Sequence, residues 1–339
     1  MKVTVGIKAR NEETHINAAI SSALAAVKPF AGTVVLADSN SRDRTVDIAK
    51  TFPVVIVQLV NALEGCCGAG AQLAFQAADC DYFYILDGDM ILDEKFLGIG
   101  INFLEKNPEF AGVGGRVEEM NIQAYEFQIR AQSPEVSPDR TRIVDRLDCG
   151  GLYRVSAIRQ VGYFADRNLH AFEEVELATR LAANGWKLAR LKEPAVQHFG
   201  HSANGYALMW RRFKTGYSGA HGEVLRGAVG RKHFSQVIAA LSHIRISIIV
   251  MLWWMSIVLS LTLAPSLAIK ALLVIVLVAL PCGLLSIRRR SWVLGVFSFV
   301  SWNFMAIGLI AGFFRKRVSP QKPIDMFILQ NSGLTTVEQ

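Results

Sequence analysis

The chain has 339 residues, 51% of them hydrophobic, and a formal net charge of +7. This length allows one sizeable soluble domain with an appended region. Five cysteines without a Cys-x-x-Cys pair argue against a disulfide framework or a zinc site and favour a reducing compartment. The basic excess flanks apolar segments, which is typical of contact with anionic lipid, so we expect no nucleic-acid partner.

In chain order, residues 1–235 alternate short apolar strands with helical stretches. The strands are expected at Val3–Ile7, Thr33–Ala37, Val54–Gln58 and Tyr82–Leu86, and the helices at Glu13–Ala26, from Arg42 onward, and at Ala69–Ala78. This alternation predicts an α/β fold with a mostly parallel sheet covered by helices on both faces. The first strand starts directly after Lys2, so we expect no signal peptide.

Polar residues follow three of these strands. They are the loop Lys8-Ala9-Arg10-Asn11-Glu12, then Asp38, then Asp87-Gly88-Asp89. Ligands of parallel sheets bind outside the carboxyl ends of the strands, where these three loops converge. Although an Asp-Gly-Asp unit is often only a turn, two carboxylates at this place also suit a divalent cation that bridges a diphosphate.

Four ordered segments resemble the family 2 glycosyltransferases of the GT-A fold. Val5–Glu13 resembles their first strand and loop, Asp38–Thr45 their D-x-x-S-x-D-x-T stretch, Asp87–Asp89 their D-x-D, and Phe172–Leu177 with Arg180 and Gly185 their E-D-x-x-L-x-x-R-L-x-x-x-G segment. Cys149–Arg154, before Val161–Phe164, is similar to the acceptor-side loop that precedes this last segment.

The resemblance implies a nucleotide-diphosphosugar donor of the UDP or GDP type. Lys8, Ala9, Arg10, Asn11, Glu12 and Asp38 would contact the base and ribose, with Asp87 and Gly88 near the sugar. Asp89 and Asp87 would ligate Mn²⁺ or Mg²⁺, with His198, or alternatively His201, as a further metal ligand. Glu174 occupies the position of the catalytic base, and Glu173 and Glu176 are its rivals.

The chain departs from the family pattern at four places. Lys8 replaces a common proline, Ser39 replaces an aspartate, and Gly70-Ala71-Gln72 replaces an A-R-N stretch whose arginine could touch phosphate. Glu174 replaces the usual aspartate and is one methylene longer. On a helix, Glu173 and Glu176 share a face, whereas Glu174 points about 100° away from Glu173.

The C-terminal part is strongly apolar. Residues 244–264 and 267–287 are each long enough to span about 30 Å of hydrocarbon. The third apolar segment, 292–314, either crosses or forms a re-entrant or interfacial hairpin broken near Ser301–Asn303. A hairpin would keep Arg288–Arg290 and Arg315–Arg317 on the cytoplasmic side, whereas a crossing would place Arg315–Arg317 outside, against the positive-inside rule. We favour two spans and leave both alternatives open for the third segment.

The expected organisation is a catalytic domain at 1–204, amphipathic interfacial helices at 205–242, a membrane region at 243–317 and a cytoplasmic tail at 318–339. The leading hypothesis is a metal-dependent inverting glycosyltransferase of the inner membrane. Its catalytic domain is cytoplasmic and its acceptor is a hydroxyl of a lipid-linked saccharide in envelope or exopolysaccharide assembly. A polyprenyl-phosphate sugar synthase and a non-catalytic membrane scaffold are the alternatives.

Overall fold

The computed structural model describes residues 1–121, 138–200 and 205–331. The chain divides into two compact units, which we treat separately. Unit 1 contains Met1–Ala203 and Arg317–Gln339, and unit 2 contains Asn204–Lys316. His201, the alternative metal ligand, lies outside the described residues.

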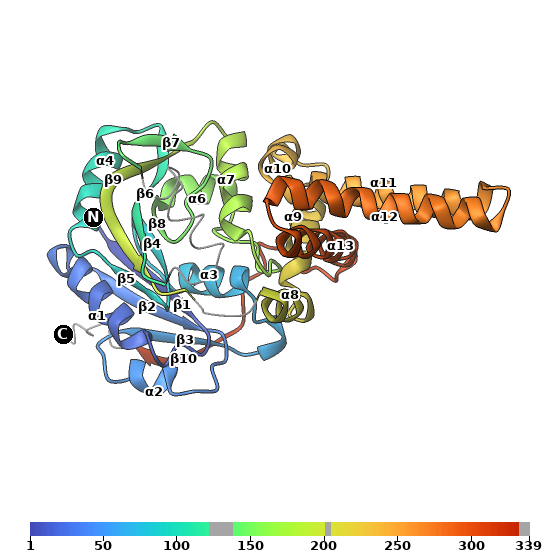
Figure 1. Ribbon diagram of the computed structural model, residues 1–339. Helices are drawn as coiled ribbons and strands as arrows, with labels where there is room; N and C mark the ends of the chain where they lie inside the picture. Colours follow the sequence, from blue (N-terminus) through green and yellow to red (C-terminus); the bar gives the residue numbers. More distant parts are fainter. Residues whose placement is uncertain (122–137, 201–204, 332–339) are drawn as a thin grey trace, which may run out of the picture. The chain divides into compact units, whose positions relative to one another are not determined.

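Unit 1 is built on one large sheet (Figure 1). Its strands are β1 (Val3–Ala9), β2 (Thr33–Asp38), β3 (Val55–Leu59), β4 (Tyr82–Asp87), β5 (Met90–Leu92), β6 (Phe110–Glu119), β7 (Arg142–Val144), β8 (Gly151–Arg154), β9 (Lys187–His198) and β10 (Met326–Asn331). In the described part of the chain the order is β10-β3-β2-β1-β4-β8-β6-β9-β5, with β7 beside β9.

The sheet is mixed rather than mostly parallel. The four strands predicted from the sequence, β3, β2, β1 and β4, are parallel neighbours. Beyond them, β8 runs antiparallel to both β4 and β6, and β5 and β7 run antiparallel to β9. The α/β class is confirmed, and β6 and β9 form a further parallel pair within this mixed sheet.

Helices cover both faces of this sheet. They are α1 (Ile16–Val27), α2 (Thr45–Ala49), α3 (Cys67–Gln76), α4 (Phe96–Lys106), α6 (Val155–Val161) and α7 (Glu173–Ala183). Alternate residues of each strand serve the two faces: Val34 and Leu36 of β2 pack in a core with α1 and α4, whereas Val35 and Ala37 pack with α3, α6 and α7. The fully buried strands therefore read as continuous apolar runs.

The segment expected to be a tail instead completes the sheet. Strand β10 pairs antiparallel with the edge strand β3, with Met326 opposite Leu59 and Asn331 opposite Val55. The Gln76 amide donates to the Ile324 carbonyl at 2.9 Å and accepts from the Ile324 N–H at 2.8 Å. Because β3 would otherwise expose an unpaired edge, an extended apolar segment adds to it readily.

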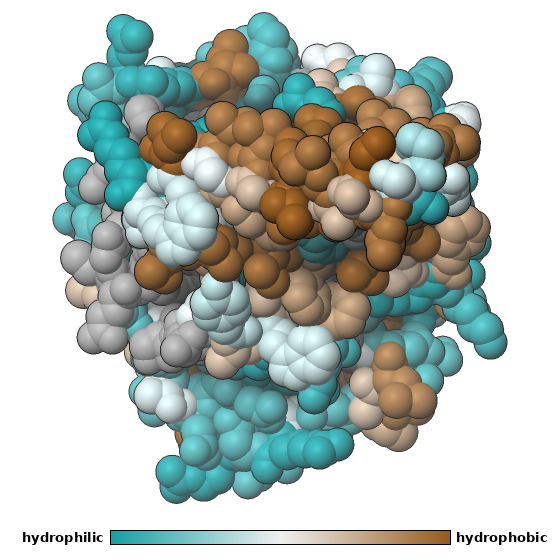
Figure 2. Space-filling model, turned by 45° about the vertical axis from the view of Figure 1, so that its right-hand side comes forward, coloured by the Kyte–Doolittle hydropathy of each residue, from teal (hydrophilic) through white to brown (hydrophobic). Residues whose placement is uncertain are grey.

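Unit 2 is helical. Its helices are α8 (Gly205–Lys214), α9 (Ala220–Ala228), α10 (Phe234–Ala240), α11 (Ser242–Leu263), α12 (Leu267–Arg289) and α13 (Trp292–Phe314). The last three are long and apolar enough to cross a membrane. Figure 2 shows the broad hydrophobic surface of this part of the molecule, to which exposed side chains such as Leu252, Leu263, Leu267 and Ile275 contribute.

Helix α13 is continuous, so it lacks the break near Ser301–Asn303 that the hairpin alternative required. The polar residues at this point are satisfied without unwinding the helix. The Asn303 amide donates to the Phe299 carbonyl at 2.9 Å, and its oxygen accepts from the Trp254 indole of α11 at 2.8 Å. The aromatic residues Trp210 and Phe213 of α8 pack on Phe304, so this expected interfacial helix also packs within unit 2.

Candidate active site

The sheet register brings the predicted loops together. Lys8 lies opposite Asp87 on the neighbouring strand β4, and Ala9 lies opposite Asp38 on β2. The carboxyl ends of three parallel strands therefore meet at one edge of the sheet, where the loop after β1, Asp38 and the Asp-Gly-Asp unit follow one another. These residues come together because adjacent parallel strands end at the same level.

Lys8 joins two parts of the site that are far apart in the sequence. Its ammonium lies 2.6 Å from a carboxylate oxygen of Glu173, the first residue of α7, and 3.2 Å from one of Asp87. Burial opposes its charge, but Asp87 and Glu173 hold the pKa of Lys8 well above its usual value. The lysine that replaces the family's proline thus links the Asp-Gly-Asp unit to α7.

Three carboxylates crowd together beside this lysine. Burial, then Asp89 and Asp87, raise the pKa of Glu12 to about 8. Burial also raises the pKa of Asp87, with Lys8 opposing and Asp89 adding to the shift. Gly88 admits this crowding, because a Cβ there would lie 2.9 Å from Cγ of Glu12. Such mutual repulsion is relieved by a cation, so the donor set fits Mg²⁺ or Mn²⁺.

His198 faces this acidic group from β9. Its Nε2 lies 3.6 Å from Asp89, and its Nδ1 lies 2.6 Å from Glu119, which is opposite it on β6. Burial lowers the ring's basicity, but Asp89 and Glu119 together raise the pKa of His198 to about 9. Carboxylate–histidine pairs of this kind orient the ring in many metal sites, so His198 could join the donor set of Asp87 and Asp89.

Glu119 was missed by the sequence reasoning. It lies 79 residues from His198, and only the parallel pairing of β6 with β9 brings the two together. Possible ligand atoms of Glu119, Cys149 and His198 all lie within 4.8 Å of one another. Glu119 is the last residue of β6, a strand that was not predicted from the sequence, and nothing local showed which strand would be its neighbour.

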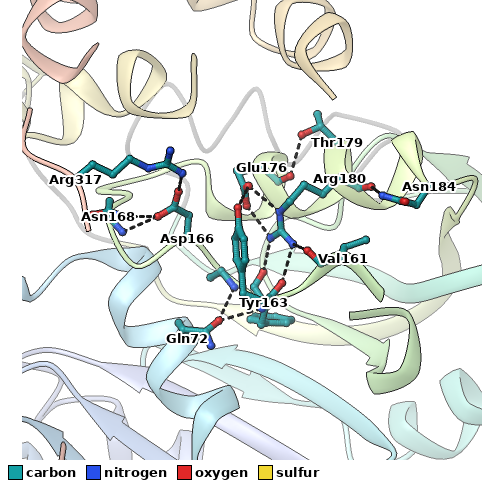
Figure 3. Close-up of polar contacts among 12 residues, drawn as sticks. Gln72, Val161, Tyr163, Asp166, Asn168, Glu176, Thr179, Arg180, Asn184 and Arg317 are labelled. Carbon is teal, nitrogen blue, oxygen red and sulfur yellow. Dashed lines mark hydrogen bonds and ion pairs between the residues drawn. The ribbon is translucent and has the colours of Figure 1, made fainter. Parts of the chain in front are cut away.

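The three glutamates of the first turn of α7 have different surroundings. Glu173 is paired with Lys8. Glu176 is paired with Arg180 at 2.7 and 2.8 Å and also accepts from the Tyr163 hydroxyl at 2.8 Å (Figure 3). Glu174 is only half-buried and has no such ion pair in the described part of the chain. Burial and then Glu173 raise the pKa of Glu174 to about 8.

Arg180 and Gln72 position α7 through the turn that precedes it. The Arg180 guanidinium donates to the carbonyls of Val161, Tyr163 and Phe164 at 2.7 to 3.2 Å, as Figure 3 shows for the first two. The Gln72 side chain accepts from the N–H groups of Phe164 and Ala165, each at 3.0 Å. These supporting contacts were not predicted, although Gln72 and Arg180 both lie in motifs that the sequence reasoning singled out.

Asp38 supports the loop that follows it. Its carboxylate is fully buried and accepts from the Ser41 N–H at 3.0 Å and from the Gln58 amide at 2.8 Å. Asn11 has a left-handed backbone with φ of 60°, and its side-chain oxygen accepts from the Arg42 N–H at 2.8 Å. The guanidinium of the exposed Arg10 donates to the Gly65 carbonyl at 3.4 Å. The loops after β1 and β2 are therefore held to each other.

Comparison with known proteins agrees with this arrangement. Residues 4–162 match the family described as glycosyl transferase family 2. Glucomannan 4-beta-mannosyltransferase 7 of Arabidopsis thaliana is 29% identical over 131 residues, which cover 35% of this chain and 22% of that protein. Probable glucomannan 4-beta-mannosyltransferase 11 of the same plant is 26% identical over 131 residues, or 35% of this chain and 28% of that protein. The match thus spans about a quarter of these relatives.

Among solved structures, S. aureus TarS 1–349 in complex with UDP has a TM-score of 0.52 at 16% identity, covering 98% of this chain and 97% of that one. Its complex with UDP-GlcNAc has a TM-score of 0.51 at 14% identity, with the same coverage. At such low identity the likeness concerns the fold. The family match therefore identifies a glycosyl transferase family 2 domain over residues 4–162, and the solved structures add a likeness of fold.

Proposed function

We propose that the protein is a metal-dependent inverting glycosyltransferase that moves a sugar from a nucleotide diphosphate to a hydroxyl group. The observation that carries this proposal is that the acidic residues have two different kinds of surroundings. Glu12, Asp87 and Asp89 crowd together opposite His198, whereas Glu174 stands apart with a raised pKa. The first group suits a cation, and the second suits a proton acceptor.

Asp89, Asp87 and His198 would hold Mn²⁺ or Mg²⁺, which when bound neutralises the diphosphate that departs. Lys8 adds a fixed positive charge at the same place, held by Asp87 and Glu173. This charge matters because Ala71 and Gln72 leave the chain without the arginine of the family's A-R-N stretch. The ribose and base of the donor would lie against the loops supported by Asp38 and Asn11.

Glu174 is the proposed base. Its carboxylate takes the proton of the acceptor hydroxyl, and the oxygen forms a bond to the anomeric carbon as the bond to the diphosphate breaks. Attack from the face opposite the leaving group inverts the anomeric centre. Glu173 is a weaker candidate, because its carboxylate is already engaged by the Lys8 ammonium at 2.6 Å.

A base is needed for a hydroxyl acceptor but not for a phosphate, so Glu174 favours a saccharide acceptor over polyprenyl phosphate. The apolar helices of unit 2 favour an acceptor that is itself attached to the membrane, such as a lipid-linked saccharide. We place the protein in the inner membrane with its catalytic domain on the cytoplasmic side, because Arg288–Arg290 follows α12 in the chain.

The test is nucleotide release by the detergent-purified protein with UDP- and GDP-sugars and Mn²⁺ or Mg²⁺. Each donor is offered with a lipid-linked saccharide, with polyprenyl phosphate, and with neither. Release that requires the saccharide supports the proposal, and release that requires only polyprenyl phosphate supports the synthase instead. If the folded protein releases nucleotide from none of the donors, an enzymatic function is contradicted. Lys2→Ala, which alters an exposed ion pair with Asp79, is the matched control.

A further inference from the structure

The described residues contain three helices that are long and apolar enough to cross a membrane, α11, α12 and α13. If all three crossed, the chain before α11 and the chain after α13 would lie on opposite sides of the bilayer. An even number of crossings leaves both on the same side. The side of the membrane on which the chain continues after α13 therefore decides whether the number of crossings is odd or even.

After α13 the chain returns to the sheet of unit 1. Arg317 is paired with the buried Asp166 at 2.6 Å. The Asn168 side chain donates to the Val318 carbonyl and accepts from the Val318 N–H, each at 2.8 Å. Strand β10 then pairs with β3 along its length. Residues 317–331 are an integral part of a domain whose other strands all precede α11, so they lie on the same side of the membrane as those strands.

From this pairing we propose that α11 and α12 cross the bilayer as a hairpin, and that α13 lies in the cytoplasmic membrane interface without crossing. The three-residue turn Ala264-Pro265-Ser266 makes α11 and α12 adjacent antiparallel helices. The Trp253 indole of α11 donates to the Leu277 carbonyl of α12 at 2.8 Å. Figure 1 shows these two helices side by side, whereas α13 is seen nearly end-on and so runs across the hairpin.

The surroundings of α13 support this assignment. A larger share of its side chains is buried than in α11 or α12. Its C-terminal half packs closely on the polar helix α9: a Cβ at Gly222 would lie 2.2 Å from the Leu309 carbonyl. Beside this contact Glu223, which is buried, is paired with Arg315. Charged residues are expensive within hydrocarbon, so this end of α13 belongs in the interface.

The charge of unit 2 fits a bilayer surface. Residues 205–316 contain thirteen lysines and arginines but only one acidic residue, Glu223. With α13 in the interface, Arg288–Arg290 at one end and Arg315–Arg317 at the other both face the cytoplasmic side. Basic residues at this level attract anionic headgroups. A crossing α13 would instead carry one of the two clusters to the far side, against the positive-inside rule.

Cysteine accessibility tests this topology and does not depend on enzymatic activity. Cells that express the full chain with Ser266→Cys, Ser291→Cys or Ser319→Cys are treated with a membrane-impermeant maleimide, before or after permeabilisation. Labelling is read by mass spectrometry of the peptide with the new cysteine, and the native chain is the reference. We expect Ser266→Cys to be labelled in intact cells, and the other two only after permeabilisation. Labelling of Ser319→Cys in intact cells would show that α13 crosses and overturn the proposal, as would protection of Ser266→Cys.

A cross-link tests the strand pairing on which the argument depends. Val55 and Asn331 are partners in the β3–β10 register. A Val55→Cys and Asn331→Cys double variant should form a disulfide in native membranes on mild oxidation. The control pairs Val55→Cys with Met326→Cys, which is at the other end of β10, opposite Leu59. Equal cross-linking of the two pairs, or none in the first, would remove the basis for an even number of crossings.

Discussion

Replacing Arg180 by alanine should destabilise unit 1 severely. The five N–H groups of its guanidinium find acceptors in Glu176 and in the carbonyls of Val161, Tyr163 and Phe164. The same group lies 3.7 Å from the centre of the Tyr163 ring. Both Arg180 and Glu176 are buried. Removal of Arg180 therefore leaves a buried carboxylate without its cation and three carbonyls without their donor.

The expected loss follows from the buried charge. Removing one partner of a buried ion pair costs about 3–5 kcal/mol, because the other charge stays in a poorly solvated place. For a domain of this size, each kcal/mol lowers Tm by roughly 2–4 °C, so we expect a decrease of roughly 6–20 °C. The double variant Glu176→Met with Arg180→Met should recover part of this loss, since it removes both charges, but not the part due to the three carbonyls.

The assay is thermal unfolding of the detergent-purified protein, followed by intrinsic fluorescence. Lys2→Ala is the control, because its ion pair with Asp79 is exposed and exposed pairs contribute little to stability. An Arg180→Ala protein with the same Tm as Lys2→Ala would refute the reasoning, because the buried ion pair would then contribute no more to stability than an exposed pair. So would a double variant less stable than the single one.

Three further predictions concern the site and its support. Glu174 must be ionised to act as a base, and its raised pKa of about 8 means that kcat/KM should fall about tenfold per pH unit below pH 8. Glu174→Gln should lower kcat about 10²–10⁴-fold and remove this pH dependence, and an unchanged profile would exclude Glu174. Chelation should abolish activity, and activity that survives chelation would exclude a catalytic role for the metal. Asp89→Ala should weaken Mn²⁺ binding, as measured by calorimetry. Gln76→Ala removes two hydrogen bonds to the Ile324 backbone and should speed hydrogen exchange in β10, while exchange in α4 stays unchanged.

The sequence predicted those features of the fold that depend on neighbours in the chain. Val34, Val35 and Leu36 are consecutive apolar residues, as expected of a strand covered on both faces, and Asp38 follows where the strand ends. The convergence of Asp38 with Asp87 followed from a general property of parallel sheets. The two long apolar helices before residue 290 were also evident, because length and composition alone define them.

The features that were not predicted depend on contacts between distant parts of the chain. Lys8 and Glu173 are 165 residues apart, and no local pattern indicates that one will neutralise the other. The pairing of β10 with β3 depends on an edge that becomes available only once the sheet has formed. The sequence Met326–Asn331 is compatible with either an irregular tail or a strand, and it becomes a strand because the edge strand β3 is available for pairing.

The first turn of α7 shows why these distant contacts matter for the chemistry. Acidic residues are favourable at a helix N-terminus, so three glutamates there would not by themselves distinguish a base. The distinction comes from their partners: Lys8 fixes Glu173, and Arg180 with Tyr163 fixes Glu176. Because Glu173 and Glu176 are both held by partners, rotation of α7 about its axis is restricted, and the direction of the Glu174 side chain is restricted with it. Without an ion pair of its own in the described residues, Glu174 keeps the raised pKa that the proposed base would need for proton transfer near neutral pH.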